Sequence, residues 1–272
     1  MAITTLRIPR PRMVPGRADG LKRPSLLYLA AELPRSAAEY GWLQAARPLL
    51  TRAPVGDGHH VLVLPGLIAD DRSTRALRWF LRDLGYQVHG WQLGTNLPSP
   101  DMATRLRALL DRLHDDDPQP MSIIGWSLGG IYARSVSRVL PERIRQVITL
   151  GSPFRTSRGY ESNAAPIVRA GARLQGLRVT TTGPPGNDEP VPVPSTAIFS
   201  RSDGVVPWRA CLDTPGWPHE TLEVVGSHVG LGHHPAVLWA IADRLAQPEG
   251  TWMPMRVPTV WRTVLFPHPG RP

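Results

Sequence analysis

A serine set among glycines is the first feature of this sequence that could carry chemistry. Residues 125–130 read Gly-Trp-Ser-Leu-Gly-Gly, a G-x-S-x-G pattern centred on Ser127. An apolar run precedes it at 121–124, and a helical pattern follows it at 128–140. Glycines permit a tight strand-to-helix turn that lifts the serine hydroxyl to the amino end of the helix, where backbone N–H groups face developing negative charge. The pattern predicts that Ser127 is a nucleophile, and the alternative is a plain turn with an exposed serine.

The sequence around Ser127 alternates between short apolar runs and amphipathic helical patterns. Such alternation is typical of right-handed βαβ crossovers, and therefore of a mostly parallel sheet with helices on both faces. We expect Ser73 and Ser99 to cap the first two helices, with Pro100 at the first helical position. The expected strands are 61–64, 86–91, 121–125, 146–150, 196–200 and 221–225, and the expected helices follow at 73–84, 101–113, 128–140 and 235–246.

One main domain with flanking segments is predicted. Residues 1–57 form a Pro- and Arg-rich leader and a helical arm broken near Pro34, and residues 58–247 form the α/β domain. Within that domain, 154–195 interrupts the alternation with an expected helix at 165–174 and a Pro-Gly-rich stretch, which we interpret as an inserted cap. Residues 248–272 are a Pro-rich tail with no periodic pattern.

Over residues 60–246 the chain resembles the α/β-hydrolase superfamily, and within it the bacterial lipase and esterase type. This resemblance depends on the G-x-S-x-G sequence between a strand and a helix, with partners following in the order serine, acid, histidine. It implies the α/β-hydrolase fold, a doubly wound and mostly parallel sheet with an inserted cap. It also implies a nucleophile at Ser127, the position that matches the family's motif.

The resemblance assigns the rest of a catalytic triad. A serine hydroxyl needs an imidazole base and a carboxylate that orients the imidazole. Asp203 lies just past the expected strand 196–200, where the family keeps its acid, although Asp-Gly is also a common turn. His228 lies after the last expected strand in a loop with flanking glycines, where the family keeps its histidine. Its rivals His233 and His234 precede a proline and are expected to cap the final helix.

An oxyanion hole and substrate contacts follow from the same resemblance. The family's hole uses the backbone amide after the nucleophile and one after the first strand, which here are those of Leu128 and Leu67. Pro65 replaces the family's usual histidine before Gly66, which removes a side chain that often supports this loop. Trp126 and Trp208 are expected to contact the substrate. The lining of the pocket is expected to include Trp91, Leu93 and Asn96.

Composition excludes several other classes of protein. The chain has 272 residues, 42% of them hydrophobic and 19% charged, which is too apolar for a mainly disordered protein. The net charge of +9 comes almost entirely from scattered Arg, because Lys22 is the one lysine among 31 basic residues, and this distribution argues against a nucleic-acid surface. Cys211 is the single cysteine, so an intrachain disulfide and a cysteine-based zinc site are excluded.

We therefore predict a cofactor-free and metal-free serine hydrolase that cleaves carboxylic esters, with lipophilic acyl esters favoured. The alternatives are an acyltransferase with the same triad and a catalytically silent binding module of the same fold. No apolar run reaches the length of a membrane span, and no signal peptide is evident, which favours a cytoplasmic protein. The expected partner is a small ester or lipid and not nucleic acid, and peripheral contact with lipid is the one membrane association considered.

Overall fold

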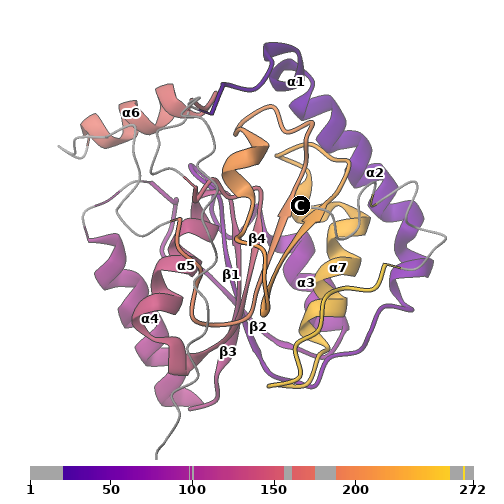
Figure 1. Cartoon of the computed structure of the whole chain (residues 1–272), viewed down its shortest axis with the longest axis vertical. Helices are drawn as coiled ribbons and strands as arrows, with labels where there is room; N and C mark the ends of the chain where they lie inside the picture. Colours follow the sequence, from indigo (N-terminus) through magenta and orange to yellow (C-terminus); the bar gives the residue numbers. More distant parts are fainter. Residues whose placement is uncertain are drawn as a thin grey trace, which may run out of the picture.

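A six-stranded, all-parallel sheet forms the centre of the molecule in the computed structural model, which describes residues 21–97, 99, 101–155, 161–174, 188–257 and 266 (Figure 1). The strands lie in the order β2-β1-β3-β4-β5-β6, so that β3 has two strands on one side and three on the other. After β2 the chain crosses back over β1, and β3 to β6 are added on the other side of β1. The strands are β1 His60–Leu64, β2 Gln87–Gly90, β3 Met121–Trp126, β4 Ile144–Leu150, β5 Ser195–Phe199 and β6 His219–Glu223.

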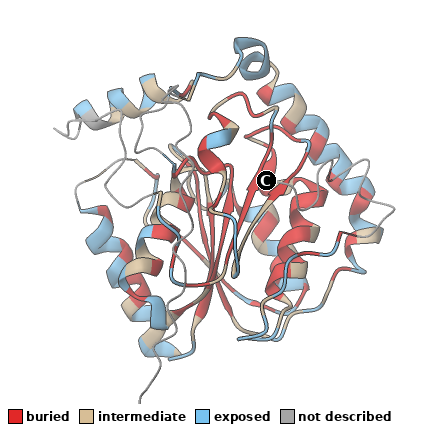
Figure 2. Cartoon of the chain, in the orientation of Figure 1, coloured by how far each residue is buried: buried red, intermediate tan, exposed pale blue. Residues whose placement is uncertain are grey.

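Helices cover both faces of the sheet. The helices α4 (Met102–Asp116) and α5 (Leu128–Val139) lie on one face, while α2 (Glu32–Leu50), α3 (Arg75–Asp83) and α7 (Pro235–Leu245) lie on the other (Figure 1). Along β1, alternate side chains join two separate apolar clusters, one under each layer of helices. Every residue of β1 is buried for this reason, and Figure 2 shows the same for the central strands. This explains why these strands are continuous apolar runs in the sequence.

The predicted parallel sheet is confirmed, and the ends of its strands and helices differ from expectation by at most three residues. The expected cap at Ser73 is wrong, because α3 begins at Arg75 with Thr74 in the N-cap position. The Ser73 hydroxyl instead donates to the Asp70 carbonyl at 2.7 Å, within a turn. The expected cap at Ser99 is also wrong: α4 begins at Met102 after Asp101, and the expected role of Pro100 lies outside the described residues.

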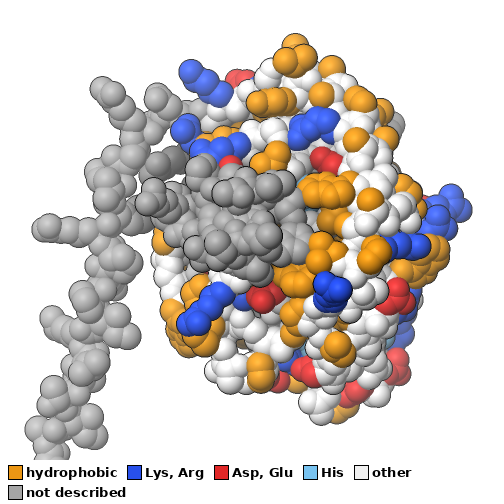
Figure 3. All heavy atoms as spheres, turned by 90° about the vertical axis from the view of Figure 1, so that its right-hand side faces the viewer, with side chains coloured by type: hydrophobic (Ala, Val, Ile, Leu, Met, Phe, Trp, Pro, Cys, Tyr) orange, Lys and Arg blue, Asp and Glu red, His pale blue; other side chains and the backbone are white. Residues whose placement is uncertain are grey.

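The helical arm is present as two helices, α1 (Leu26–Ala30) and α2. They meet at Ala31 and not at Pro34, which lies in the first turn of α2, where the missing N–H has no intrahelical partner to lose. The outer side of the arm, which faces the viewer in Figure 3, carries exposed apolar side chains that include Leu26, Leu27 and Leu33. Peripheral contact with lipid stays a prediction.

Only part of the predicted cap is described. It contains α6 (Ala165–Leu174), whose bounds are those expected, and the segment 188–194 before β5. The rest of the cap, at 156–160 and 175–187, lies outside the described residues, as do the leader 1–20 and most of the tail after 257. The division into leader, main domain and tail stays a prediction. Among the described residues, no helix combines the length and apolar character needed to span a membrane.

Candidate functional site

Ser127 lies at the carboxyl edge of the sheet, between the end of β3 and the first residue of α5. Its backbone has φ 52° and ψ −117°, a conformation that L-residues other than glycine rarely adopt. Its amide donates to the Leu150 carbonyl at 2.8 Å, which ties the turn to the end of β4. Such strain costs about 1–3 kcal/mol and persists where the surroundings hold it, most often at active sites. The nucleophilic role of Ser127 stays a prediction, which this strained strand-to-helix turn, the elbow, suits.

The glycines of the motif are needed because backbone segments approach one another closely. A Cβ atom at Gly125 would lie 2.4 Å from the Cα atom of Gly130, across the turn. A Cβ at Gly129 would lie 2.6 Å from the Leu64 carbonyl oxygen, and one at Gly130 would lie 2.0 Å from Ser152 Oγ. Any larger residue would therefore push α5 away from the strands. The glycines keep the helix against the sheet so that the serine protrudes beside its amino end.

Asp203 and His228 come together from neighbouring strand ends. Asp203 follows β5 and His228 follows β6, and the imidazole Nδ1–H donates to Asp203 Oδ2 at 2.6 Å. The other carboxylate oxygen accepts the amides of Val205 and Val206 at 2.7 and 2.8 Å. Both side chains are buried. Because the carboxylate holds Nδ1, the second ring nitrogen, Nε2, is left to act as a base.

The surroundings of His228 favour its protonated form. Burial alone would lower the pKa of this imidazole, but the charge of Asp203 and its hydrogen bond act in the opposite direction, with a further contribution from Glu32. The sum raises the pKa above its ordinary value of 6.5. A base of this kind stabilises the imidazolium that forms when a nucleophile loses its proton to it.

Two contacts bring the base loop to the elbow. Gly151, directly after β4, has φ +54°, and a Cβ there would lie 3.0 Å from His228 Nδ1, so the imidazole rests against the backbone of this residue. The indole of Trp126, directly before Ser127, donates to the His228 carbonyl at 3.1 Å. Ser127, Asp203 and His228 thus lie beyond the carboxyl ends of β3, β5 and β6, on the same edge of the sheet. Trp126 acts here on protein backbone, and its predicted contact with substrate stays a prediction.

The loop after β1 runs beside the elbow. A Cβ at Gly66 would lie 3.4 Å from Ser127 Cβ, which places the next residue, Leu67, close to the serine. Leu128 is the first residue of α5, so its amide has no partner within the helix. The roles of the Leu67 and Leu128 amides in an oxyanion hole stay predictions, and the position of both residues beside Ser127 is compatible with them.

Asn96 has a role that the sequence did not indicate. Its side-chain NH₂ donates to the Pro65 carbonyl at 2.8 Å, and its backbone carbonyl accepts from the Ile68 amide at 2.7 Å. Asn96 is fully buried, and these two hydrogen bonds hold the loop after β1. Trp91, also expected to line the pocket, is fully buried and joins the core beneath the sheet. Only the polarity of Asn96 could have hinted at a structural role, since its partners are distant in sequence.

Trp208 lines a cavity of about 400 Å³ that reaches Asp203. The indole stacks on Phe199 at 5.5 Å between ring centres, and the guanidinium of Arg201 lies over the indole, 4.2 Å from its ring centre. Lys22 and Arg23, from the segment before α1, also line this cavity. The position of Trp208 suits the predicted contact with substrate.

A second group of serine, histidine and aspartate lies at the opposite, amino-terminal edge of the sheet. Ser195, the first residue of β5, donates to Asp213 Oδ2 at 2.5 Å and is 2.9 Å from His219 Nδ1. Here the serine stands between the other two, and Asp213 forms its ion pair with Arg134 at 2.7 Å. A carboxylate that is paired with Arg134 does not orient the imidazole, and burial lowers the pKa of His219. These residues form a polar network in which the serine, and not the histidine, lies between the other two, so it does not have the arrangement of a triad.

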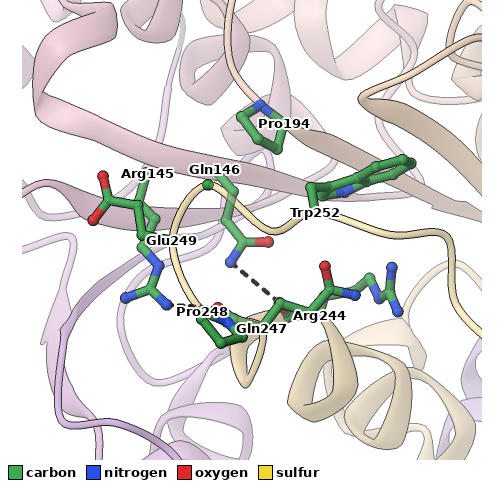
Figure 4. Close-up of a pocket in the computed structure, with 9 residues that line it drawn as sticks. Arg145, Gln146, Pro194, Arg244, Gln247, Pro248, Glu249 and Trp252 are labelled. Atoms are coloured by element: carbon green, nitrogen blue, oxygen red, sulfur yellow. Dashed lines mark hydrogen bonds between the residues drawn. The ribbon is translucent and has the colours of Figure 1, made fainter.

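The same amino-terminal edge has a small cavity of about 30 Å³, drawn in Figure 4. It lies between the start of β4 and the end of α7, where Gln146 donates to the Arg244 carbonyl at 3.3 Å. That volume holds about one water molecule, so the cavity is no substrate site. Within the described part of the chain, no cluster of His, Cys, Asp and Glu could hold a metal ion.

Several solved structures are similar to this fold, whereas sequence comparisons find no match. No family model and no curated protein matches the sequence. Among solved structures, the chain is similar to lipase B of Aspergillus fumigatus, with a TM-score of 0.56 and 14% identity over 72% of this chain and 54% of that one. It is also similar to a pyrethroid hydrolase from Sphingobium faniae JZ-2, with a TM-score of 0.52 and 20% identity over 70% and 98% of the two chains.

A third similar structure is the mature form of the Bacillus licheniformis lipase BlEst2, with a TM-score of 0.51 and 13% identity over 72% of this chain and 95% of that one. The present chain spans about half the length of the Aspergillus lipase and nearly all of the other two. At such identities the likeness concerns the fold, and it confirms the fold predicted from the sequence.

Proposed function

We propose that this chain, which has the α/β-hydrolase fold, is a serine hydrolase that cleaves carboxylic esters with Ser127, His228 and Asp203 as its triad. The observation that supports this most directly is the strained backbone of Ser127, at the same edge of the sheet as the short His228–Asp203 hydrogen bond. Strain of this kind is retained where it places a reactive group, and the paired carboxylate leaves the imidazole ready to accept a proton.

In the proposed mechanism, Ser127 Oγ attacks the ester carbonyl while His228 Nε2 takes its proton. Asp203 keeps the imidazole oriented and stabilises its charged form, and the amides of Leu67 and Leu128 donate to the oxyanion of the tetrahedral intermediate. The imidazolium then returns the proton to the leaving alcohol, and an acyl-enzyme remains. Water, activated in turn by His228, releases the carboxylic acid and restores the serine.

The proposed substrates are lipophilic acyl esters. The similar structures include two named lipases, and the cavity beside Asp203 has Trp208 in its wall. Trp126 and Trp208 remain the proposed substrate contacts, and residence in the cytoplasm remains a prediction.

A series of p-nitrophenyl esters from acetate to palmitate tests this proposal. Activity should be lost in Ser127→Ala, and a fluorophosphonate probe should add once, at Ser127, as measured by intact mass. Ser195→Ala is the matched control, because it removes the serine of the other Ser-His-Asp group. Activity lost in Ser195→Ala with full probe labelling of Ser127→Ala would reverse the assignment of the nucleophile.

The products decide between hydrolysis and acyl transfer. With an added alcohol, a hydrolase releases mainly the free acid, whereas an acyltransferase releases mainly the new ester. A wild-type protein that neither turns over any ester nor takes up the probe would contradict the proposal and favour a silent binding module.

A further inference from the structure

One face of α2 changes character halfway along the helix. Its buried residues are spaced by three or four positions, so they lie on a single face. In the second half of the helix these residues are apolar and join the core, whereas in the first half they include Glu32 and Glu39. Buried carboxylates are uncommon unless they are paired or hydrogen-bonded, so the partners of these two side chains define the role of the arm.

Glu32 binds both loops that carry the proposed acid and base. One carboxylate oxygen accepts the amide of Gly204 at 2.8 Å, and the other accepts the amide of Val229 at 2.9 Å. Gly204 directly follows Asp203, and Val229 directly follows His228. A single buried side chain therefore joins the acid loop to the base loop next to the point where Asp203 and His228 meet.

The neighbouring residues of the same helix bind the other side of each loop. Glu39 accepts the amide of Ser227 at 2.7 Å and its hydroxyl at 2.6 Å, and Ser227 directly precedes His228. Arg35 donates to the carbonyl of Ser202 at 2.8 Å and to its hydroxyl at 2.7 Å, and Ser202 directly precedes Asp203. The arm thus holds the residues on both sides of the acid and of the base.

Two glycines in these loops leave the space that the arm occupies. A Cβ at Gly204 would lie 2.5 Å from the backbone nitrogen of Leu29 in α1, and a Cβ at Gly230 would lie 1.5 Å from Glu39 Oε2. Neither glycine has a positive φ, so no turn requires it. The Asp203-Gly204 pair is therefore explained by the close approach of the arm.

We infer that Glu32 is a positioning residue of the triad, whose buried carboxylate fixes the distance between the acid and base loops and places a negative charge between them. This inference rests on the function proposed above for Asp203 and His228. The proposal gives the helical arm an indirect role in the reaction, through the two loops that its carboxylate joins.

Several charged groups surround the base. Asp203 faces His228 from the loop after β5, and Glu32 faces it from α2; both raise the pKa of the imidazole against the lowering effect of burial. Glu39 and Arg35 of α2 and His233 of the 3₁₀ turn Leu231–His233 act on one another near the base loop. Glu39 is not among the groups that shift the pKa of His228, which makes it a matched control on the same helix face.

Glu32→Gln tests the inference, with Glu39→Gln as its control. The Gln side chain has the size of Glu but no charge. Its NH₂ group, a donor, would face one of the two backbone N–H donors and could not accept its hydrogen bond. We expect kcat for ester hydrolysis to fall by about 10- to 100-fold with KM within about twofold, because a charge-assisted pair of hydrogen bonds is lost. The acid limb of kcat/KM should move to lower pH in Glu32→Gln, because the imidazolium loses a stabilising charge, and should not move in Glu39→Gln.

The outcomes separate this inference from the proposed function. An unchanged acid limb in Glu32→Gln, with a fall in kcat equal to that of Glu39→Gln, would reduce Glu32 to a structural role and overturn the inference while hydrolysis stands. If Glu32→Gln fails to fold, Glu32→Asp keeps the charge on a shorter side chain, and a wild-type kcat in that variant also overturns it. If the wild type proves inactive, the proposed function fails, and NMR titration of His228 in the wild type and Glu32→Gln still tests the electrostatic effect.

Discussion

Replacement of Gly129 by alanine tests whether the close approach of α5 to the first strand places the nucleophile. A Cβ at this position would lie 2.6 Å from the Leu64 carbonyl oxygen and 2.7 Å from that of Pro65. Ordinary contacts begin near 3.4 Å, so the helix and the loop after β1 must separate by about 0.8 Å. The clashing atoms are backbone, which cannot turn aside as a side chain can. The displaced parts carry Ser127 and the two amides proposed for the oxyanion.

The expected loss follows from that displacement. Catalytic groups need to be held within about 0.5 Å of their productive positions, and a misplacement of about 1 Å lowers the rate about 100-fold. We therefore expect kcat for ester hydrolysis to fall about 100-fold in Gly129→Ala. Forcing a methyl group into a packed site should also lower the free energy of unfolding by about 1–3 kcal/mol, measured by urea denaturation.

Gly41→Ala is the control for the effect of a methyl group alone. Gly41 lies in α2, and a Cβ there has no atom within 4 Å. Alanine should raise the free energy of unfolding by about 0.5–1 kcal/mol, because it has the higher helix propensity, and should leave kcat unchanged. If Gly129→Ala keeps both the kcat and the stability of the wild type, close packing of the elbow does not place the serine, and the reasoning is refuted.

Four further results are expected. Asp203→Asn should lower kcat for ester hydrolysis about 10³- to 10⁴-fold, because Asn favours the wrong imidazole tautomer. A loss of less than tenfold would exclude Asp203 as the acid. In the wild type, the acid limb of kcat/KM should lie above pH 6.5, because the base must be neutral and the pKa of His228 is raised; a midpoint below 6.5 contradicts this. Arg134→Met should lower the free energy of unfolding by about 3–5 kcal/mol, because it leaves the buried carboxylate of Asp213 unpaired, and urea denaturation measures this. Asn96→Ala should lower kcat about tenfold by freeing the loop after β1, and an unchanged kcat would show that the loop needs no support.

Sequence reasoning works here where a signal is local. The central strands were predictable because both faces of the sheet are covered there, which makes them largely apolar runs such as β1. Ser127 was predictable because the turn that presents it needs glycines at fixed positions in the motif. The predicted N-caps at Ser73 and Ser99 were wrong because α3 begins at Arg75 and α4 at Met102, so each serine lies one residue or more before the N-cap position; Ser73 lies in the preceding turn.

The parts of the site that sequence reasoning missed depend on contacts between distant residues. Glu32 lies 172 positions before Gly204 and 197 before Val229, and nothing in the pattern of α2 separates a buried glutamate from a solvated one. A carboxylate on a helix is usually exposed, so composition favours the wrong interpretation. The signal lies in the loops that Glu32 and Glu39 contact. Gly204 and Gly230 occupy positions where no turn requires glycine, and each lies against the arm. A glycine without a conformational reason is a sign of close approach, and here two such glycines, next to the proposed acid and base, mark where the arm holds the site.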